Sequence, residues 1–182
     1  NETNEMSGSK SFSMKITMTT PADNISPIID LQRLSLFLIQ NRLFSPVSGT
    51  TPDFVAETTN TGGSTPAKYI TRPITLENEA TALDIRLSAA VRASSSVKMF
   101  YRTTSVDDVR KLGDVAWRAF NTDGSADSSP EPSKNDNDFK EFKFSQSDLE
   151  PFSAFSLKIV LTGTISSYPP LIKDMRGIAL AI

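Results

Sequence analysis

The chain has 182 residues and a formal net charge of −2, with 38% hydrophobic and 22% charged residues. This length suits one folded domain with a real core, and the slight acidity excludes a global basic field for nucleic acid. The sequence contains no cysteine and no histidine, which excludes disulfides, thiolate nucleophiles and Ser–His–Asp catalysis. We therefore expect a protein that is not an enzyme and holds no cofactor.

The two ends of the chain set the expected domain boundaries. Asn1–Lys10 is polar and lacks the apolar region of a signal peptide, so we expect a flexible lead-in over 1–10 and a single domain over 11–182. The longest apolar runs, Leu34–Ile39 and Gly177–Ile182, are too short to span a bilayer. We expect no membrane partner.

An internal repeat joins the two ends: Ser11–Ile39 resembles Ala154–Ile182 without gaps. Each copy reads as an alternating strand, a polar bridge ending in proline, and a second apolar strand. Such a unit cannot bury its own apolar face, which predicts that the two copies share a core. The identical positions are Phe12/Phe155, Ser13/Ser156, Lys15/Lys158, Ile16/Ile159, Thr19/Thr162, Pro27/Pro170, Ile29/Ile172, Arg33/Arg176 and Ile39/Ile182.

In chain order, period-two alternation predicts a strand over Ser11–Thr19, and a second strand follows over Ile28–Ile39. Ser45–Lys68 is polar and rich in proline and glycine, which indicates a long loop. A strand enters at Lys68–Ile74, and the polar run 77–79 reads as a turn.

The middle of the chain carries the clearest patterns. Thr81–Arg92 and Ser96–Thr103 both alternate and are separated by a small polar turn, which predicts an antiparallel hairpin. Ser105–Gly113 has a capping serine, early aspartates and a final glycine, which predicts one short helix.

The remaining elements complete an all-β pattern. We expect strands over Val115–Asn121 and Phe139–Phe144, separated by the polar acidic loop Thr122–Asp138. About eight strands at this spacing favour a jelly-roll-like antiparallel β-sandwich with long loops and at most one or two short helices.

The acidic loop is the candidate metal site, because hard oxygen ligands gathered in a loop suit calcium. No EF-hand spacing is present, so a solvated loop is the simpler interpretation. The candidate ligands are Asp123, Asp127, Asp136 and Asp138.

Two further features have a functional and a structural interpretation. Arg33 and Arg176 each follow an aspartate, which suits anion recognition or, more simply, a structural ion pair. Trp117 and Tyr168 are the candidate rings for sugar stacking, although aromatic residues in alternating strands usually pack in a core.

Three segments carry a resemblance to a known class of protein: FSLKIVLTGTISSYPPLIKDMRGIALAI at the end, SPIIDLQRLSLFLIQNRL near the start and AKYITRPITLENEATALDIRLSAAVR in the middle. This wording resembles virion structural proteins of tailed marine phages, in which such segments form a β-sandwich module of the tail or baseplate. The resemblance implies a non-enzymatic module located in the virion, a homo- or hetero-oligomer whose partners are other virion proteins.

Other functions stay open at this point. The alternative is a carbohydrate-binding module for host attachment with a galactose-binding-like sandwich, in which Trp117 and Tyr168 would contact a glycan. A carboxylate-based glycosidase would require two acids facing one another across a cleft, an arrangement that the sequence does not indicate.

Overall fold

A computed structural model describes residues 15–21, 28–29, 57–63, 65, 67–165 and 168–181. Contacts divide the chain into two compact units, Asn1–Gln40 and Asn41–Ile182. Most of the first repeat copy lies outside the described residues, so the core shared between the two copies stays a prediction, as does the single domain over 11–182. Residues 15–20, which are described, are exposed and form no strand. The predicted strand over 11–19 is therefore wrong for residues 15–19.

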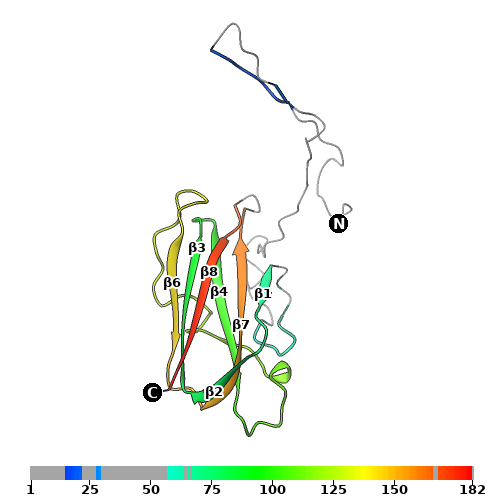
Figure 1. Cartoon of the computed structure of the whole chain (residues 1–182), viewed down its shortest axis with the longest axis vertical. Coiled ribbons are helices and arrows are strands. Elements are labelled where there is room, and N and C mark those ends of the chain that lie inside the picture. The colour runs from blue at the N-terminus through cyan, green and yellow to red at the C-terminus, as the bar shows by residue number, and fades with distance from the viewer. Residues whose placement is uncertain are drawn as a thin grey trace. The chain divides into compact units, whose positions relative to one another are not determined.

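The second unit is an antiparallel β-sandwich of two sheets (Figure 1), which confirms the predicted fold class. Sheet A has five strands, in which β7 pairs with β1, β2 and β4, and β4 pairs with β5. Sheet B has three strands in the order β6-β3-β8. The strands of sheet A are β1 (Lys68–Ile70), β2 (Ile74–Ala80), β4 (Ser95–Thr104), β5 (Arg118–Ala119) and β7 (Phe152–Gly163). Those of sheet B are β3 (Ala82–Ala90), β6 (Lys140–Gln146) and β8 (Leu171–Leu180).

The core lies between the two sheets and is built from alternate residues of their long strands. As the alternation predicts, Leu83, Ile85 and Leu87 of β3 are buried, while the residues between them are half-buried. Each fully buried side chain of this kind stabilises the fold by roughly 1.5–3 kcal/mol. The other sheet contributes Val97, Met99, Tyr101, Phe155, Leu157 and Ile159 to the same cluster.

The connection after β3 corrects one prediction. The expected hairpin between Thr81–Arg92 and Ser96–Thr103 does not form, because β3 belongs to sheet B and β4 to sheet A. The chain crosses between the sheets there, and Ser133 holds the crossing through its Oγ on the Val91 N–H (2.9 Å) and its own N–H on the Val91 carbonyl (2.7 Å). Both apolar faces then meet across the core. In a two-stranded hairpin they would have lain side by side.

The second repeat copy crosses in the same way. Its two predicted strands are present as β7 and β8, but β7 lies in sheet A and β8 in sheet B. The proline-ended bridge between them is therefore the connection from one layer to the other.

The predicted helix over Ser105–Gly113 is also wrong: the segment forms turns and leads into a short 3-10 helix, Leu112–Asp114. Val106 and Val109 are 72% and 100% exposed, so a helix here would have no apolar face to pack. The Asp108 carboxylate instead accepts the backbone N–H of Arg110 (2.9 Å), a local bond that competes with helix formation.

Smaller differences concern element boundaries. Residues 77–79 lie within β2 and form no turn, in a stretch where the register with β7 is irregular. The strand expected over Val115–Asn121 is reduced to the two residues of β5, and residues 122–139 form the predicted loop. In the part of the chain that the structure describes, no helix is long and apolar enough to cross a membrane.

Candidate functional site: the open face and edge of sheet B

The two outer faces of the sandwich differ, and the face of sheet A is closed. Lys158 in the middle of β7 and Glu57, which lies before β1, have fully buried side chains, with Nζ and Oε2 3.0 Å apart. Lys158 Nζ also donates to the carbonyls of Glu57 and Gly62, and the Thr65 N–H donates to Glu57 Oε1 (2.7 Å). These bonds hold the segment 57–65 on the sheet. We call Glu57 and Lys158 the enclosed pair.

Aromatic rings pack around the lysine of the enclosed pair. Lys158 Nζ lies 4.7 Å from the ring centroid of Phe100 and 5.1 Å from that of Trp117. The guanidinium of Arg102 lies 4.3 Å from the Trp117 centroid. Cations over aromatic faces are stabilised by the ring quadrupole, so the rings both exclude water and favour the charged lysine.

The electrostatics of the enclosed pair favour an ion pair. Burial raises the pKa of Glu57, but hydrogen bonds from Thr65 and Lys158 outweigh that effect and hold the pKa below its ordinary value. Burial lowers the pKa of Lys158, and the Glu57 carboxylate offsets part of that change. Structural ion pairs also shift pKa values, and the bonds of Lys158 run to backbone carbonyls of the chain itself, so a structural role is the simpler interpretation.

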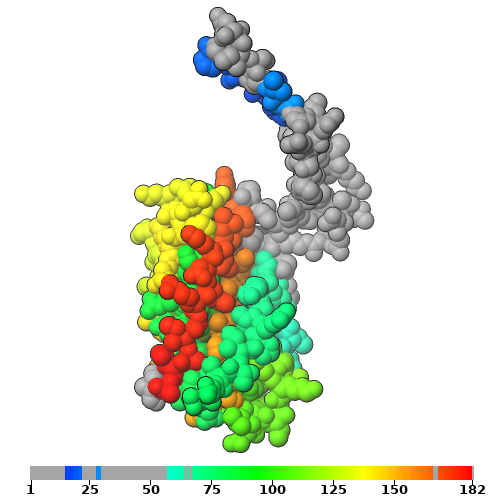
Figure 2. All heavy atoms as spheres, in the orientation of Figure 1, coloured from blue at the N-terminus to red at the C-terminus, as the bar shows by residue number. Residues whose placement is uncertain are grey.

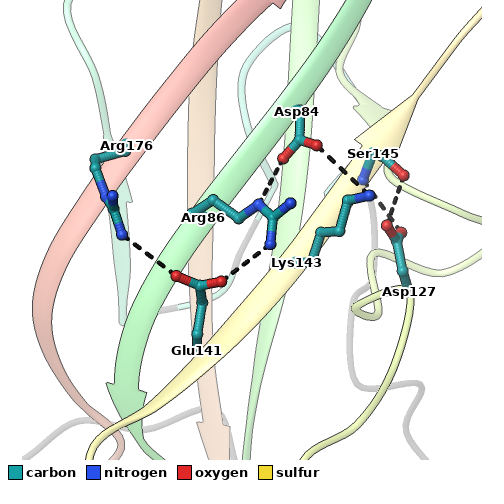
Figure 3. A network of polar contacts seen from close by, with 7 residues as sticks. All are labelled: Asp84, Arg86, Asp127, Glu141, Lys143, Ser145 and Arg176. Atoms are coloured by element: carbon teal, nitrogen blue, oxygen red, sulfur yellow. Dashed lines mark hydrogen bonds and ion pairs between the residues drawn. The ribbon is translucent and has the colours of Figure 1, made fainter.

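The outer face of sheet B carries exposed charges (Figure 3). Arg86 on β3 bonds Asp84 through Nε (2.9 Å) and Glu141 on β6 through Nη1 (3.0 Å). Arg176 on β8 reaches the other oxygen of Glu141 (3.3 Å), and Lys143 lies 3.5 Å from Asp84. Asp84 and Glu141 raise the pKa of Arg86. These contacts form a polar network across all three strands.

Strand β8 forms an edge of sheet B, because β3 is its one neighbour in the described sheet. Figure 2 shows β8, in red, at the surface along much of its length. Its exposed apolar side chains are Leu171, Ile172, Ile178 and Leu180, at 36%, 38%, 48% and 42%. A long edge strand with exposed apolar residues is a template for pairing with another chain. This edge is therefore the candidate site for contact with another chain.

The four aspartates of the acidic loop are each engaged by a donor of the protein itself. Asp123 pairs with Lys98, Asp127 accepts the Ser145 N–H (3.1 Å), Asp136 pairs with Arg92 (2.7 Å) and Asp138 accepts the Lys134 N–H (2.8 Å). Among the residues that the structure describes, no group of three or more acidic residues could hold a metal ion. Calcium binding by this loop stays a prediction.

The two candidate stacking rings lie in different surroundings. Trp117 is 2% exposed and belongs to the wall of the enclosed pair, which leaves almost no ring surface for a ligand. Tyr168 is 48% exposed, and the guanidinium of Arg92 lies 5.2 Å from its centroid. Glycan binding at Tyr168 stays a prediction. The aspartate–arginine ion pair expected in the second repeat copy is present, because Arg176 Nε lies 3.7 Å from Asp174 Oδ2.

Sequence reasoning missed the enclosed pair. One signal was available, since Lys158 stands inside the apolar run of β7, where a charge requires a partner. Glu57 lies 101 positions away in a polar loop, and no sequence pattern links the two. The edge position of β8 was missed because strand order is not encoded in alternation.

Comparisons with known proteins give fold-level likeness only. Neither a known protein family nor a curated protein matches the sequence. Among solved structures, the chain is similar to the VP2 subviral particle of infectious bursal disease virus (12% identity, TM-score 0.32) and to the Gx strain of that virus (11% identity, TM-score 0.36). Both alignments cover 61% of this chain, and they cover 24% and 26% of the viral chains. The chain thus spans about a quarter of those proteins, and a likeness this weak carries no argument about function.

Proposed function

We propose that the chain is a non-enzymatic structural and interaction module of a phage virion, in the tail or baseplate, joined to neighbouring virion subunits, copies of itself or other virion proteins, through the edge of sheet B. The observation that carries the proposal is the ten-residue edge strand β8, whose apolar side chains are exposed. A long, exposed apolar edge is a hazard for a solitary protein and suits a component that meets a partner.

The distribution of charged groups supports the same function. The buried titratable pair, Glu57 and Lys158, is closed in by aromatic rings, and its bonds run to the protein's own backbone. The charges of sheet B lie on an outer face and bond one another across strands. A scaffold stabilised in this way can present loops and an edge to neighbours without doing chemistry.

The experiment is to locate the chain in particles. Antibodies raised against the purified protein are applied to gradient-purified tailed particles from the source of the sequence, with immunogold detection by electron microscopy. We expect gold at one end of the particles and the protein in the particle fraction. Recovery of the protein from the unassembled fraction alone would contradict the proposal, and glycan-array binding that is lost in Tyr168→Ala would support the carbohydrate-binding alternative.

A further inference from the structure

The free edge of β8 has a distinctive order of charges. Asp174 and Arg176 flank Met175, and both lie on the outer face of sheet B, opposite Ser88 and Arg86 of β3. Their side chains are 59% and 67% exposed. Met175 lies opposite the buried Leu87 and points toward the core. The segment therefore carries one negative and one positive side chain placed symmetrically about Met175.

The backbone at this edge is arranged for pairing. The Leu180 carbonyl accepts the Thr81 N–H (2.8 Å) and so points toward the β3 side. Because backbone groups alternate along a regular strand, those of Ala179, Gly177 and Met175 point toward the free edge. The register with β3 is continuous from Leu180 to Asp174, so the alternation holds over this stretch. Proline, which protects many edge strands, is absent from β8.

We propose that β8 pairs antiparallel with β8 of a second copy of this chain, about a two-fold axis at Met175. Met175 of the two copies then form a hydrogen-bonded pair. Asp174 of each copy lies opposite Arg176 of the other, at a non-hydrogen-bonded site, where side chains approach most closely. Charge complementarity thus selects the occupant of the edge.

Neighbouring registers lack this complementarity. A shift of the axis to Arg176 places the two copies of Arg176 opposite each other, and a shift to Asp174 does the same for the aspartates. Like charges directly opposite one another destabilise a strand pair. A two-fold axis that passes between two residues would place backbone groups pointing to the free edge opposite groups pointing to β3. The hydrogen bonds between the two strands would then not form. The Met175 register is therefore the favoured one.

The pairing would extend a network that already exists. Arg176 bonds Glu141, which bonds Arg86, so the charges of sheet B run from β6 to the free edge. In the proposed dimer, Asp174 of the second copy continues this row across the axis. The two-fold arrangement is isologous, so the assembly closes at two copies. This inference rests on the proposed function and names one partner within it.

The test is a charge-swap series on the full chain, measured by sedimentation equilibrium over a range of concentrations. We expect the wild type to reach twice its 19.9 kDa mass. Asp174→Arg and Arg176→Asp each place like charges at both sites, and we expect each to raise the dimer dissociation constant about tenfold or more. The double variant D174R/R176D restores opposite charges and should restore the dimer.

A mixture of the two single variants gives the sharpest result. When Asp174→Arg meets Arg176→Asp, both sites pair an arginine with an aspartate, so the mixture should form a heterodimer that neither variant forms alone. Glu150→Arg, at an exposed position outside the strands, is the matched control and should leave the dimer unchanged. A wild type that stays monomeric at all concentrations, or single variants that dimerise like the control, would overturn the proposal.

The two proposals fail separately. A monomeric wild type combined with gold labelling of particles would overturn the β8 dimer and retain the virion function. A charge-dependent dimer that is absent from particles would do the reverse. Circular dichroism and thermal unfolding of every variant verify that the sandwich is folded, and the mixing experiment is positive only with folded chains.

Discussion

The outer faces of the two sheets use charge in opposite ways. On sheet A, the side chains of Lys158 and Glu57 are fully buried, and Lys158 Nζ lies 5.1 Å from the ring centroid of Trp117. On sheet B, Arg86, Glu141 and Arg176 bond one another at the surface, where their side chains are 35–67% exposed. A buried charge is tied to a single arrangement because losing its partner is costly, whereas exposed charges contribute little to stability and can change partners.

This difference separates a structural role from an interaction role within one sandwich. The face of sheet A is already occupied by the chain's own loop. Sheet B offers an open face and a free edge, so mutations on the two faces should affect different measurements. Those on sheet A should change stability, and those on sheet B should change association.

The largest effect is expected at the enclosed pair. Lys158→Ala leaves the Glu57 carboxylate buried without its cation, and we expect a loss of roughly 3–5 kcal/mol in the free energy of unfolding, measured by urea denaturation. The double variant Lys158→Met with Glu57→Gln removes both charges and should recover part of the loss. A loss below about 1 kcal/mol in Lys158→Ala would show that the pair is not buried as described.

The next effect is expected at Gly63, which lies against Glu57. Its φ is +73°, and an added Cβ would lie 2.6 Å from the Glu57 Cα. Gly63→Ala should therefore cost roughly 1–3 kcal/mol. Gly113→Ala is the matched control, because an added Cβ there meets nothing within 4 Å. Equal unfolding midpoints for the two variants would contradict the close approach of Gly63 to Glu57.

A smaller effect is expected from acid. The pKa of Glu57 lies below its ordinary value and that of Asp123 is lowered to about 2 by Lys98 and Ser125. Depressed carboxyl pKa values stabilise the fold above the unfolded values, and that stability is lost as the pH falls through the folded ones. The thermal unfolding midpoint should therefore decrease as the pH is lowered from about 4 to about 2. Asp123→Asn should flatten the lower part of this decline slightly, since exposed pairs are screened. A pH-independent midpoint over this range would contradict the assignment.

The smallest effect on stability is expected in the network of sheet B. Glu141→Gln removes the carboxylate between Arg86 and Arg176, and we expect a thermal midpoint within about 2 °C of the wild type. The same substitution should weaken association modestly, because Arg176 loses one of its two carboxylate neighbours. A large stability loss here would erase the contrast between the two faces.

Residue patterns predicted the individual strands well, but they did not predict which sheet each strand belongs to. The alternation of Leu83, Ile85 and Leu87 correctly predicted the strand and its buried face, because burial repeats every two residues in a strand. The same pattern suggested a hairpin between β3 and β4, although the chain crosses between sheets. Alternation is identical in both cases and says nothing about which strand is the neighbour.

The sites depended even more on distant contacts. Trp117 was a candidate for sugar stacking, with core packing as the simpler interpretation, and its ring is 2% exposed beside Lys158. The partner of Lys158, Glu57, is far away in the sequence, so no local pattern indicates this environment. Arg176 and its preceding aspartate were recognised as an ion pair, because those two residues are close in the sequence. Their position at a free edge could not be predicted, because it depends on the order of the strands in sheet B, and that order is set by contacts between residues far apart in the sequence.

The most direct test of the contrast between the faces is hydrogen exchange of backbone amides at two protein concentrations. We expect the amides of β7, which is central in sheet A, to be equally protected at both concentrations. The amides of Met175, Gly177 and Ala179 on β8 should exchange quickly at low concentration and gain protection at high concentration. Protection of β8 that does not change with concentration would contradict pairing at this edge.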